Sequence, residues 1–418
     1  MALKRELGLL STILYGIGII LGAGIYALIG VGAGLAGNLL WLSFLVSAVV
    51  AIFTGLSYAE LSSMFPKAAA EYHYTKKAFG FETFSFAIGW ILVVGTVIAA
   101  STVALGFAGY FVNLFGGDKG IVAVGLIALM AALNYVGIRE SARFNNIASV
   151  VEASGLLLVV AVWLLFPPEM PGDIFELPES GVAGIMGAIG VIFFAYIGFE
   201  NIANLAEEVK DSRRNIPLAL IISLIISTIL YILVSVAAVA EVGSEALSGS
   251  DAPLTMVVTR GLGEYASILS IIALFATGNT VLIFLIAASR ILYGMSEGKS
   301  LPRFLSRTDS HGTPMFAIGI TALAAALISL SGDIKTVAQL TDMGVFIAYA
   351  AVNAALIMMA GRKLRREFTS PRLIGIPILA WLGIASSLFM LLTFEPVFWI
   401  LEAMVILAGL VFFKISKK

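Results

Sequence analysis

Twelve apolar runs follow one another along the chain, and each has enough residues to cross about 30 Å of hydrocarbon as a helix. Backbone groups in lipid have no water to bond, so each run must satisfy its own hydrogen bonds as an α-helix. The sequence therefore predicts an all-α polytopic membrane protein with twelve transmembrane helices. The runs lie at 9–34, 38–61, 83–113, 121–137, 145–166, 182–207, 214–240, 264–293, 315–331, 336–360, 373–392 and 396–414.

The composition agrees with a membrane protein and excludes a chain that folds in water. Of the 418 residues, 60% are hydrophobic and 12% are charged, whereas soluble proteins are about half apolar and a quarter charged. The net charge of −1 gives no sign of a nucleic-acid partner. Cysteine is absent, which excludes disulfides and thiolate metal sites. The loops between the runs are short, so any function must lie within the helical bundle.

Lysine and arginine predict the orientation, because cytoplasmic loops carry an excess of them. With twelve spans and the N-terminus in the cytoplasm, all but three of the 25 basic residues fall on the cytoplasmic side, the exceptions being Lys119, Arg260 and Lys335. Residues 1–8 lead into the first run without a small-residue cleavage site, which indicates a first span rather than a removed signal peptide. The chain is therefore predicted to be a multi-pass protein of the cytoplasmic membrane with both termini cytoplasmic.

Glycine weakens two of the runs. The stretch YGIGIILGAGIYALIGVGAG at 15–34 holds seven glycines, although each weakens a helix by about 1 kcal/mol relative to alanine. The sixth run has a similar point at 190–217, where aromatic residues crowd Gly198 and Glu200 follows. Runs 1–5 and 6–10 have opposite predicted topology, as an inverted repeat requires. The predicted organisation is a first repeat at 1–166, a second at 167–360, and two further helices at 361–418.

Two broken helices side by side predict a binding site near the middle of the membrane. A break exposes N–H groups that hold an anion and C=O groups that hold a cation. A zwitterion fits such a pair, with its carboxylate on Gly22–Ala23–Gly24 and its ammonium on the carbonyls around Phe194–Ile197. Glycine also lets backbone approach a ligand closely. The alternative is that Gly18 and Gly22, spaced as G-x-x-x-G, form a helix-packing face.

Five motifs occur in order along nearly the whole chain. They are GIILGAGIY at 18–26, SYAELSSMFP at 57–66, GIRESARFNN at 137–146, FFAYIGFENIANLAEEVKDSRRNIP at 193–217, and ASRILYGMSEGKSLPRFLSRTDSHGTP at 288–314. Together they resemble the amino acid–polyamine–organocation superfamily of transporters. The likeness is strongest to its cationic amino acid transporter-like branch and to archaeal and bacterial permeases.

The resemblance implies the leucine-transporter fold, a 5+5 inverted repeat with broken helices 1 and 6 and two C-terminal helices. It implies alternating access and transport of amino acids or related amines, and no cofactor or resident metal is expected. Phe194 corresponds to an aromatic gate, and the Ile197 carbonyl to a ligand of the amino group. The expected substrate-binding residues are Gly22, Ala23, Gly24, Ile25, Phe194, Ala195, Ile197 and Gly198.

The chain departs from the family pattern at two places. Relatives usually have a Gly/Ser-rich P-x-S/G-G-x-Y after the second helix, whereas this chain has PKAAAEYHY at 66–74. A role shared with relatives therefore cannot be assigned to this segment. Proton-coupled relatives often carry a lysine in the fifth helix, in the place of a sodium ion used by sodium-coupled relatives. The corresponding residue here is Glu152.

Glu152 lies within an apolar helix, where an ionised carboxylate costs at least about 2.5 kcal/mol. A carboxyl that gains and loses a proton as water access alternates is a candidate proton carrier. It could equally ligate a cation such as Na⁺ with Thr277 and Thr280 of the eighth run. The alternative is a protonated acid that pins two helices together. Because acids inside a membrane are functional by default, the predicted coupling residues are Glu152, Glu200, Thr277 and Thr280.

The other acidic residues have simpler interpretations. Glu200 begins the half-helix after the second break, where an acid stabilises the helix dipole by about 0.3–1 kcal/mol; the resemblance instead implies a gating or proton-sensing acid. Glu207 and Glu208 are expected to pair at the inner surface with neighbouring basic residues, or to form a latch. Glu60, at the end of the second run, is expected to be solvated.

Two further groups of polar residues fall in the predicted cytoplasmic loops. The basic run GRKLRREF at 361–368 is expected to anchor to anionic lipid headgroups. His73 and His311 are expected to be solvated, because they are not spaced as metal ligands.

The predicted function is secondary active transport of L-amino acids, broadly the small and apolar neutral ones, by proton symport. The expected partners are the amino acid, a co-transported proton or Na⁺, and membrane lipids. Two alternatives are an exchanger of amino acids or amines and a transporter of cationic amino acids or polyamines. A channel needs a filter repeat, a membrane enzyme a convergent catalytic set, and a primary pump a nucleotide-binding motif. The sequence shows none of these.

Overall fold

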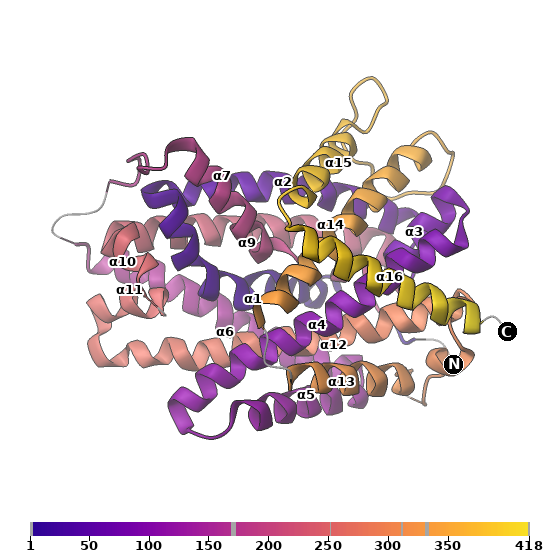
Figure 1. The fold of residues 1–418 in the computed structure, drawn as a ribbon, viewed down its shortest axis with the longest axis horizontal. Coiled ribbons are helices and arrows are strands. Elements are labelled where there is room, and N and C mark those ends of the chain that lie inside the picture. Colours follow the sequence, from indigo (N-terminus) through magenta and orange to yellow (C-terminus); the bar gives the residue numbers. More distant parts are fainter. Residues whose placement is uncertain (1–2, 169–172, 251, 311, 331–333, 417–418) are drawn as a thin grey trace.

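Long helices lying side by side form the molecule (Figure 1). The computed structural model describes residues 3–168, 173–250, 252–310, 312–330 and 334–416; His311 lies outside them. Each of the twelve apolar runs contains a helix. These are α1 (Leu9–Ala36), α2 (Leu40–Met64), α4 (Glu82–Phe115), α5 (Lys119–Val136), α6 (Ile138–Leu165), α7 (Gly181–Ile192) continued by α8 (Asn201–Asn204), α9 (Ser212–Val242), α12 (Ile268–Glu297), α13 (Met315–Ser329), α14 (Ile334–Met359), α15 (Ile378–Leu391) and α16 (Pro396–Ser416).

The lengths of these helices fit a protein that crosses a membrane many times. Within the described residues, ten helical segments are long and apolar enough to span a bilayer, while α13 and α15 are shorter apolar helices. With 15 and 14 residues, these two reach only about 21–23 Å, short of the roughly 30 Å of hydrocarbon. The all-helical, multi-pass membrane fold is confirmed, and the count of twelve spans depends on these two helices.

Short helices between the spans were not predicted from the sequence. They are α3 (Ala70–Phe79), α10 (Ser244–Ser248) and α11 (Pro253–Leu262). Figure 1 shows α3 at the end of the bundle where both chain termini lie, and α10 and α11 at the opposite end. We call the end with α3 and the start of α9 the basic face, because it carries Arg5, Lys67, Lys77, Arg213 and Arg214.

Glu60 is buried, and the prediction that it is solvated is wrong. Its carboxylate accepts hydrogen bonds from Arg366 Nη1 at 2.7 Å, Arg372 Nη2 at 2.6 Å, and the Ser370 hydroxyl at 2.6 Å. These partners belong to the segment before α15, more than 300 residues further along the chain, so no local pattern announces them. Arg366, expected at the lipid headgroups, is instead only about one-sixth exposed (17%) and ion-paired.

Candidate functional site between two broken helices

The first helix is broken at Gly22, where φ is −9° and ψ is −140°. The Thr280 hydroxyl of α12 occupies the space that a side chain at Gly22 would need. A Cβ at Gly24 would lie 2.8 Å from the Cα of Ala195. Glycine therefore lets the broken part of α1 lie directly against α12 and the sixth run. Gly18 packs closely too, against Ser149, so the glycines serve both a break and helix packing.

The sixth run is broken between α7 and α8. The helix α7 passes into a 3₁₀ turn at Phe193–Tyr196, and Ile197 is extended with φ −63° and ψ 138°. Gly198 has φ +118°, which side chains of L-residues rarely adopt. Helical structure resumes at Asn201. The sequence located this break correctly because Gly198 is the residue that makes it possible.

Tyr231 of α9 connects the two breaks. Its buried hydroxyl contacts the carbonyl oxygen of Ile20 in α1 and lies 3.0 Å from that of Ala195 in the 3₁₀ turn. A hydroxyl has one proton to donate, so it can satisfy one of these carbonyls at a time. Sequence reasoning missed Tyr231, because a single tyrosine in an apolar run carries no sign of which way it faces.

A small cavity of about 40 Å³ lies between the breaks. Ligand pockets usually measure about 300–1,000 Å³, so an amino acid requires the walls of this cavity to move apart. The cavity is lined by Ile19, Ile20, Gly24, Thr96, Ala99, Val103, Phe194, Ala195, Ile197, Glu200, Asn201, Thr280, Phe284, Thr341 and Val345.

The cavity wall brings together half of the predicted site residues: Gly24, Phe194, Ala195, Ile197, Glu200 and Thr280. Gly22 instead faces Thr280, Gly198 packs against Ile19, and Ile25 is completely buried. Glu152 and Thr277 lie outside the wall, and the side chain of Ala23 is outside the described part of the chain. The polar wall residues missed by the sequence are Thr96, Asn201 and Thr341, whose facing no motif reveals.

Glu200 is the buried acid of the cavity wall. Its Oε2 accepts hydrogen bonds from the Tyr349 hydroxyl of α14 at 2.6 Å and from the Gly198 N–H at 2.9 Å. The Asn201 side chain donates to Oε1 at 3.1 Å. Glu200 is thus bonded both to the backbone at the second break and to Tyr349 of α14. A change in the charge of Glu200 therefore affects its bonds to Gly198, Asn201 and Tyr349.

A second polar cluster lies behind the first break, between α1, α6 and α12, and we call it the Glu152 cluster. It consists of Asn145, Ser149, Glu152 and Asn279, all buried. The Asn279 Nδ2 donates to Glu152 Oε1 at 3.1 Å, and Ser149 donates to the Leu14 carbonyl at 2.9 Å. Among the described residues, Glu152 Oε2, Asn279 Oδ1 and Asn145 Nδ2 have no hydrogen-bond partner. Asn279, which lies between the two predicted threonines, is the residue that contacts Glu152.

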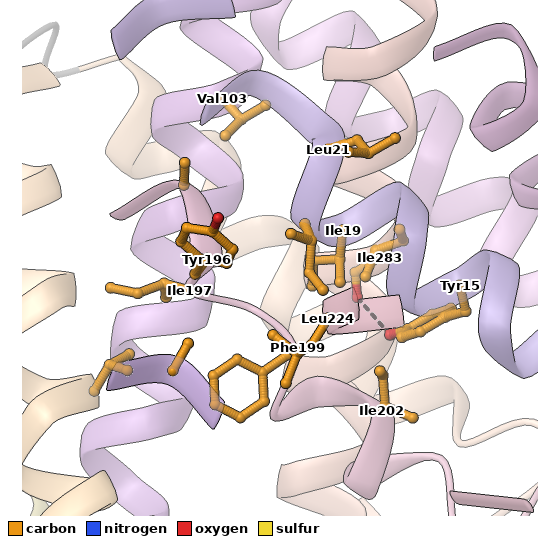
Figure 2. Close-up of a cluster of buried hydrophobic side chains, with 14 of the residues drawn as sticks. Tyr15, Ile19, Leu21, Val103, Tyr196, Ile197, Phe199, Ile202, Leu224 and Ile283 are labelled. Atoms are coloured by element: carbon orange, nitrogen blue, oxygen red, sulfur yellow. Dashed lines mark hydrogen bonds between the residues drawn. The ribbon is translucent and has the colours of Figure 1, made fainter. Parts of the chain in front are cut away.

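The path from the cavity to the basic face is closed. Figure 2 shows the apolar side chains that gather on this side of the break: Tyr15, Phe199, Ile202 and Leu224. The Tyr15 hydroxyl donates to the Ile283 carbonyl at 3.3 Å. Nearer the face, residues 6 and 7 donate their N–H groups to the Glu208 carbonyl at 2.9 and 3.0 Å. These hydrogen bonds hold the N-terminal segment against the end of the sixth run.

Glu208 itself is buried in an ion pair, and the prediction that it pairs at the inner surface is wrong. The guanidinium of Arg290 in α12 donates to Glu208 through Nε at 3.0 Å and Nη2 at 2.9 Å, and to Asn134 through Nη1 at 2.8 Å. Both charged side chains are at most 1% exposed. Glu207 pairs instead with Lys67, at 3.3 Å.

Membrane-length helices with two adjacent breaks beside a cavity are an arrangement that suits a membrane transporter. Residues 7–409 match the family model described as amino acid permease, and the chain belongs to this family. Over its full length it is 31% identical to the branched-chain amino acid permease BcaP of Bacillus subtilis, covering 94% of that protein.

Other relatives carry different names. The chain is 29% identical over its full length to a methylthioribose transporter of Bacillus subtilis, again covering 94% of that protein. Over 85% of its length it is 30% identical to a mitochondrial cationic amino acid transporter 3 of Arabidopsis thaliana, covering 62% of that longer protein. The names of these relatives do not agree on one substrate.

Replacing Gly24 by alanine is expected to abolish transport. The new Cβ would lie 2.8 Å from the Cα and 3.0 Å from the Cβ of Ala195, so the two broken segments would have to separate. The measurement is uptake of labelled amino acid by vesicles containing the purified variant. Gly106→Ala in α4 is the matched control, because nothing lies within 4 Å of its added Cβ. Equal uptake by the two variants would contradict the close approach at Gly24.

Proposed function

We propose that the protein is a secondary transporter of L-amino acids that works by alternating access and is driven by protons. The observation that carries the proposal is the cavity between two helix breaks, with a buried carboxyl in its wall. The cavity lies where the N–H and C=O groups of the two broken helices could bind the carboxylate and the ammonium group of a zwitterion. The names of two relatives, a branched-chain amino acid permease and a cationic amino acid transporter, support an amino acid as the substrate.

The substrate-binding residues are proposed from the predicted set. The backbone at Gly22, Ala23, Gly24 and Ile25 holds the carboxylate, and the Ile197 carbonyl beside Ala195 and Gly198 holds the ammonium group. Phe194 covers the site. Most of the remaining wall is apolar, with side chains such as Ile19, Val103 and Val345. Such a wall favours small and apolar neutral amino acids. Its one acid, Glu200, is already bonded to Gly198, Asn201 and Tyr349 rather than left free to pair with a cationic side chain.

The coupling residues are proposed to be Glu152 and Glu200, with Thr277 and Thr280 nearby. The Glu152 cluster supports this role, because a residue that only pins two helices would have both carboxyl oxygens bonded. One oxygen of Glu152 has no partner among the described residues, which leaves a place for a proton or a small cation. Uptake driven by an imposed Na⁺ gradient would show that the coupled ion is Na⁺ and not the proton.

The arrangement in the membrane is part of the proposal. Helices α1 to α6 up to residue 166 form the first inverted repeat, residues 167–360 the second, and residues 361–418 the two added helices. The excess of Lys and Arg at the basic face supports a cytoplasmic location for that face and for both termini. The protein then lies in the cytoplasmic membrane, with lipids as its neighbours.

The test is uptake of a panel of labelled amino acids into vesicles that contain the purified protein. Empty vesicles with an inward proton gradient are expected to accumulate an apolar amino acid, and vesicles with an imposed Na⁺ gradient alone are not. Uptake only into vesicles preloaded with unlabelled amino acid would make the protein an exchanger and overturn proton coupling. Uptake restricted to arginine, lysine or polyamines would overturn the proposed substrate class.

A further inference from the structure

The unusual segment PKAAAEYHY folds as an integral part of the closed basic face. Its alanines fit against α12, where a Cβ at Gly294 would lie 2.5 Å from the Ala68 carbonyl oxygen. Ala69, which precedes α3, has φ +53°, a left-handed conformation that L-residues rarely adopt. Three alanines therefore take the place of a Gly/Ser-rich turn. The third, Ala70, is the first residue of α3, and the acid Glu71 is the second.

Glu71 is buried although it belongs to a short helix outside the membrane-spanning segments. Its side chain and backbone together are 1% exposed. Asn204 of α8 donates to its two carboxylate oxygens at 3.3 and 3.5 Å. The same Asn204 accepts the N–H of Ala70 at 2.8 Å. The half-helix after the second break is therefore attached to α3 through the carboxyl of Glu71.

Tyr58 of α2 connects Glu71 to the aromatic residues beside the acid of the cavity wall. Its ring contacts those of Phe199 and Tyr349, with centroids 5.9 and 6.0 Å apart, and Tyr349 is the tyrosine bonded to Glu200. The buried hydroxyl of Tyr58 interacts with the Glu71 carboxyl and has no other hydrogen-bond partner among the described residues. A hydroxyl beside Glu71, on a ring packed against the tyrosine that bonds Glu200, is placed to pass a proton to Glu71.

We propose that Glu71 receives the transported proton from Glu200 through the Tyr58 hydroxyl and releases it at the basic face. Glu200 loses the proton that Glu71 gains, and Tyr58 ends as it began, having given one proton and taken another. This inference rests on the proposed proton coupling. It adds a third acid to the transport cycle, on a segment where this chain departs from its family's pattern.

The titration of Glu71 suits this role. Burial, together with the charge of Glu200, raises the pKa of the Glu71 carboxyl from 4.5 to about 7. The tyrosines that interact electrostatically with it are Tyr58 of α2, Tyr74 of α3 and Tyr349 of α14. On α4 and α12, Glu82 is ion-paired with Lys76 and Arg290 with Glu208. Burial and three neighbouring lysines lower the pKa of His73 to about 4, so Glu71 is the better proton acceptor on α3 near neutral pH.

The test compares net uptake with exchange in Glu71→Gln. Net uptake driven by a proton gradient requires the proton to leave, whereas exchange of labelled for unlabelled amino acid does not. We expect Glu71→Gln to lower net uptake by about tenfold or more while exchange falls less than about twofold. Tyr58→Phe should likewise lose net uptake and retain exchange, and Glu71→Asp should restore net uptake. Glu140→Gln, an exposed acid at the start of α6, is the control and should behave as wild type.

The dependence on pH at the basic face gives a second readout. Wild-type net uptake is expected to fall as the pH on that side drops through about 7, because the carboxyl is then already protonated. Glu71→Gln should lose this inflection. The unfolding temperature of Glu71→Gln distinguishes the loss of a proton acceptor from misfolding. A carboxyl with a raised pKa costs folding energy above its folded pKa, so at about pH 8 the glutamine variant should unfold at the same or a higher temperature.

The outcomes distinguish the two proposals. Proton-driven wild-type uptake with an unchanged inflection and unchanged net uptake in Glu71→Gln overturns the role of Glu71 alone. Equal losses of net uptake and exchange in Glu71→Gln also overturn it, because they indicate a structural role. Absence of proton-driven uptake in the wild type overturns proton coupling, and the role of Glu71 with it.

Discussion

Replacing Glu152 by glutamine is expected to lower net proton-driven uptake by about a hundredfold or more and to leave exchange nearly intact. Glutamine has the same shape, and its carbonyl oxygen can accept the 3.1 Å hydrogen bond from Asn279. A residue that only pins α6 to α12 would therefore survive the change. What glutamine cannot do is gain and lose a proton, or offer a charged ligand to a cation.

The measurement is the pair of uptake and exchange assays in vesicles, with Glu140→Gln on the same helix as the control. Glu152→Asp keeps a carboxyl and should retain part of the net uptake. If net uptake by Glu152→Gln equals that of the wild type, Glu152 only holds α6 and α12 together, and coupling would then rest on Glu200. A variant that instead loses its response to Na⁺ would show that the cluster binds a cation.

The parts of the fold that the sequence predicted are those governed by local composition. A run of about twenty apolar residues must form a helix in lipid, so the positions of the long helices follow without knowledge of any partner. The two breaks could be predicted for a similar reason, because glycine permits the φ of +118° at Gly198 and the close approach at Gly24. Both are properties of a residue and its immediate neighbours.

The parts that the sequence did not predict depend on partners distant in the chain. Glu60 was expected in solvent because its partners Arg366 and Arg372 come more than 300 residues later. Glu208 lies beside basic residues in the sequence but is paired with Arg290, 82 residues away. Tyr231 and Asn279 each stand alone in an apolar run, and only the packing of helices shows that they face a break or an acid. Charges near a membrane surface therefore cannot be assigned partners from their sequence neighbours.

Replacing Arg290 by methionine is expected to destabilise the protein by about 3–5 kcal/mol, because it leaves the Glu208 carboxylate buried without its partner. Glu208 also carries, on its backbone carbonyl, the two hydrogen bonds that hold the N-terminal segment. Loss of the pair should therefore loosen the closed basic face as well as lower the unfolding temperature. The first measurement is thermal unfolding of the purified variant.

The chain contains no cysteine, so opening can be followed with one introduced thiol. Ile202→Cys, at a completely buried position near the break, should react slowly with a membrane-impermeant maleimide added from the basic face, and faster when Arg290→Met is present.

Removing both charges with Glu208→Leu and Arg290→Met should restore most of the stability, since a buried pair is often replaced by apolar residues at little cost. Breaking the exposed pair of Glu140 and Arg143 should change stability by less than about 0.5 kcal/mol. A single Arg290→Met variant that is as stable and as unreactive as wild type would show that the buried pair does not hold the basic face closed.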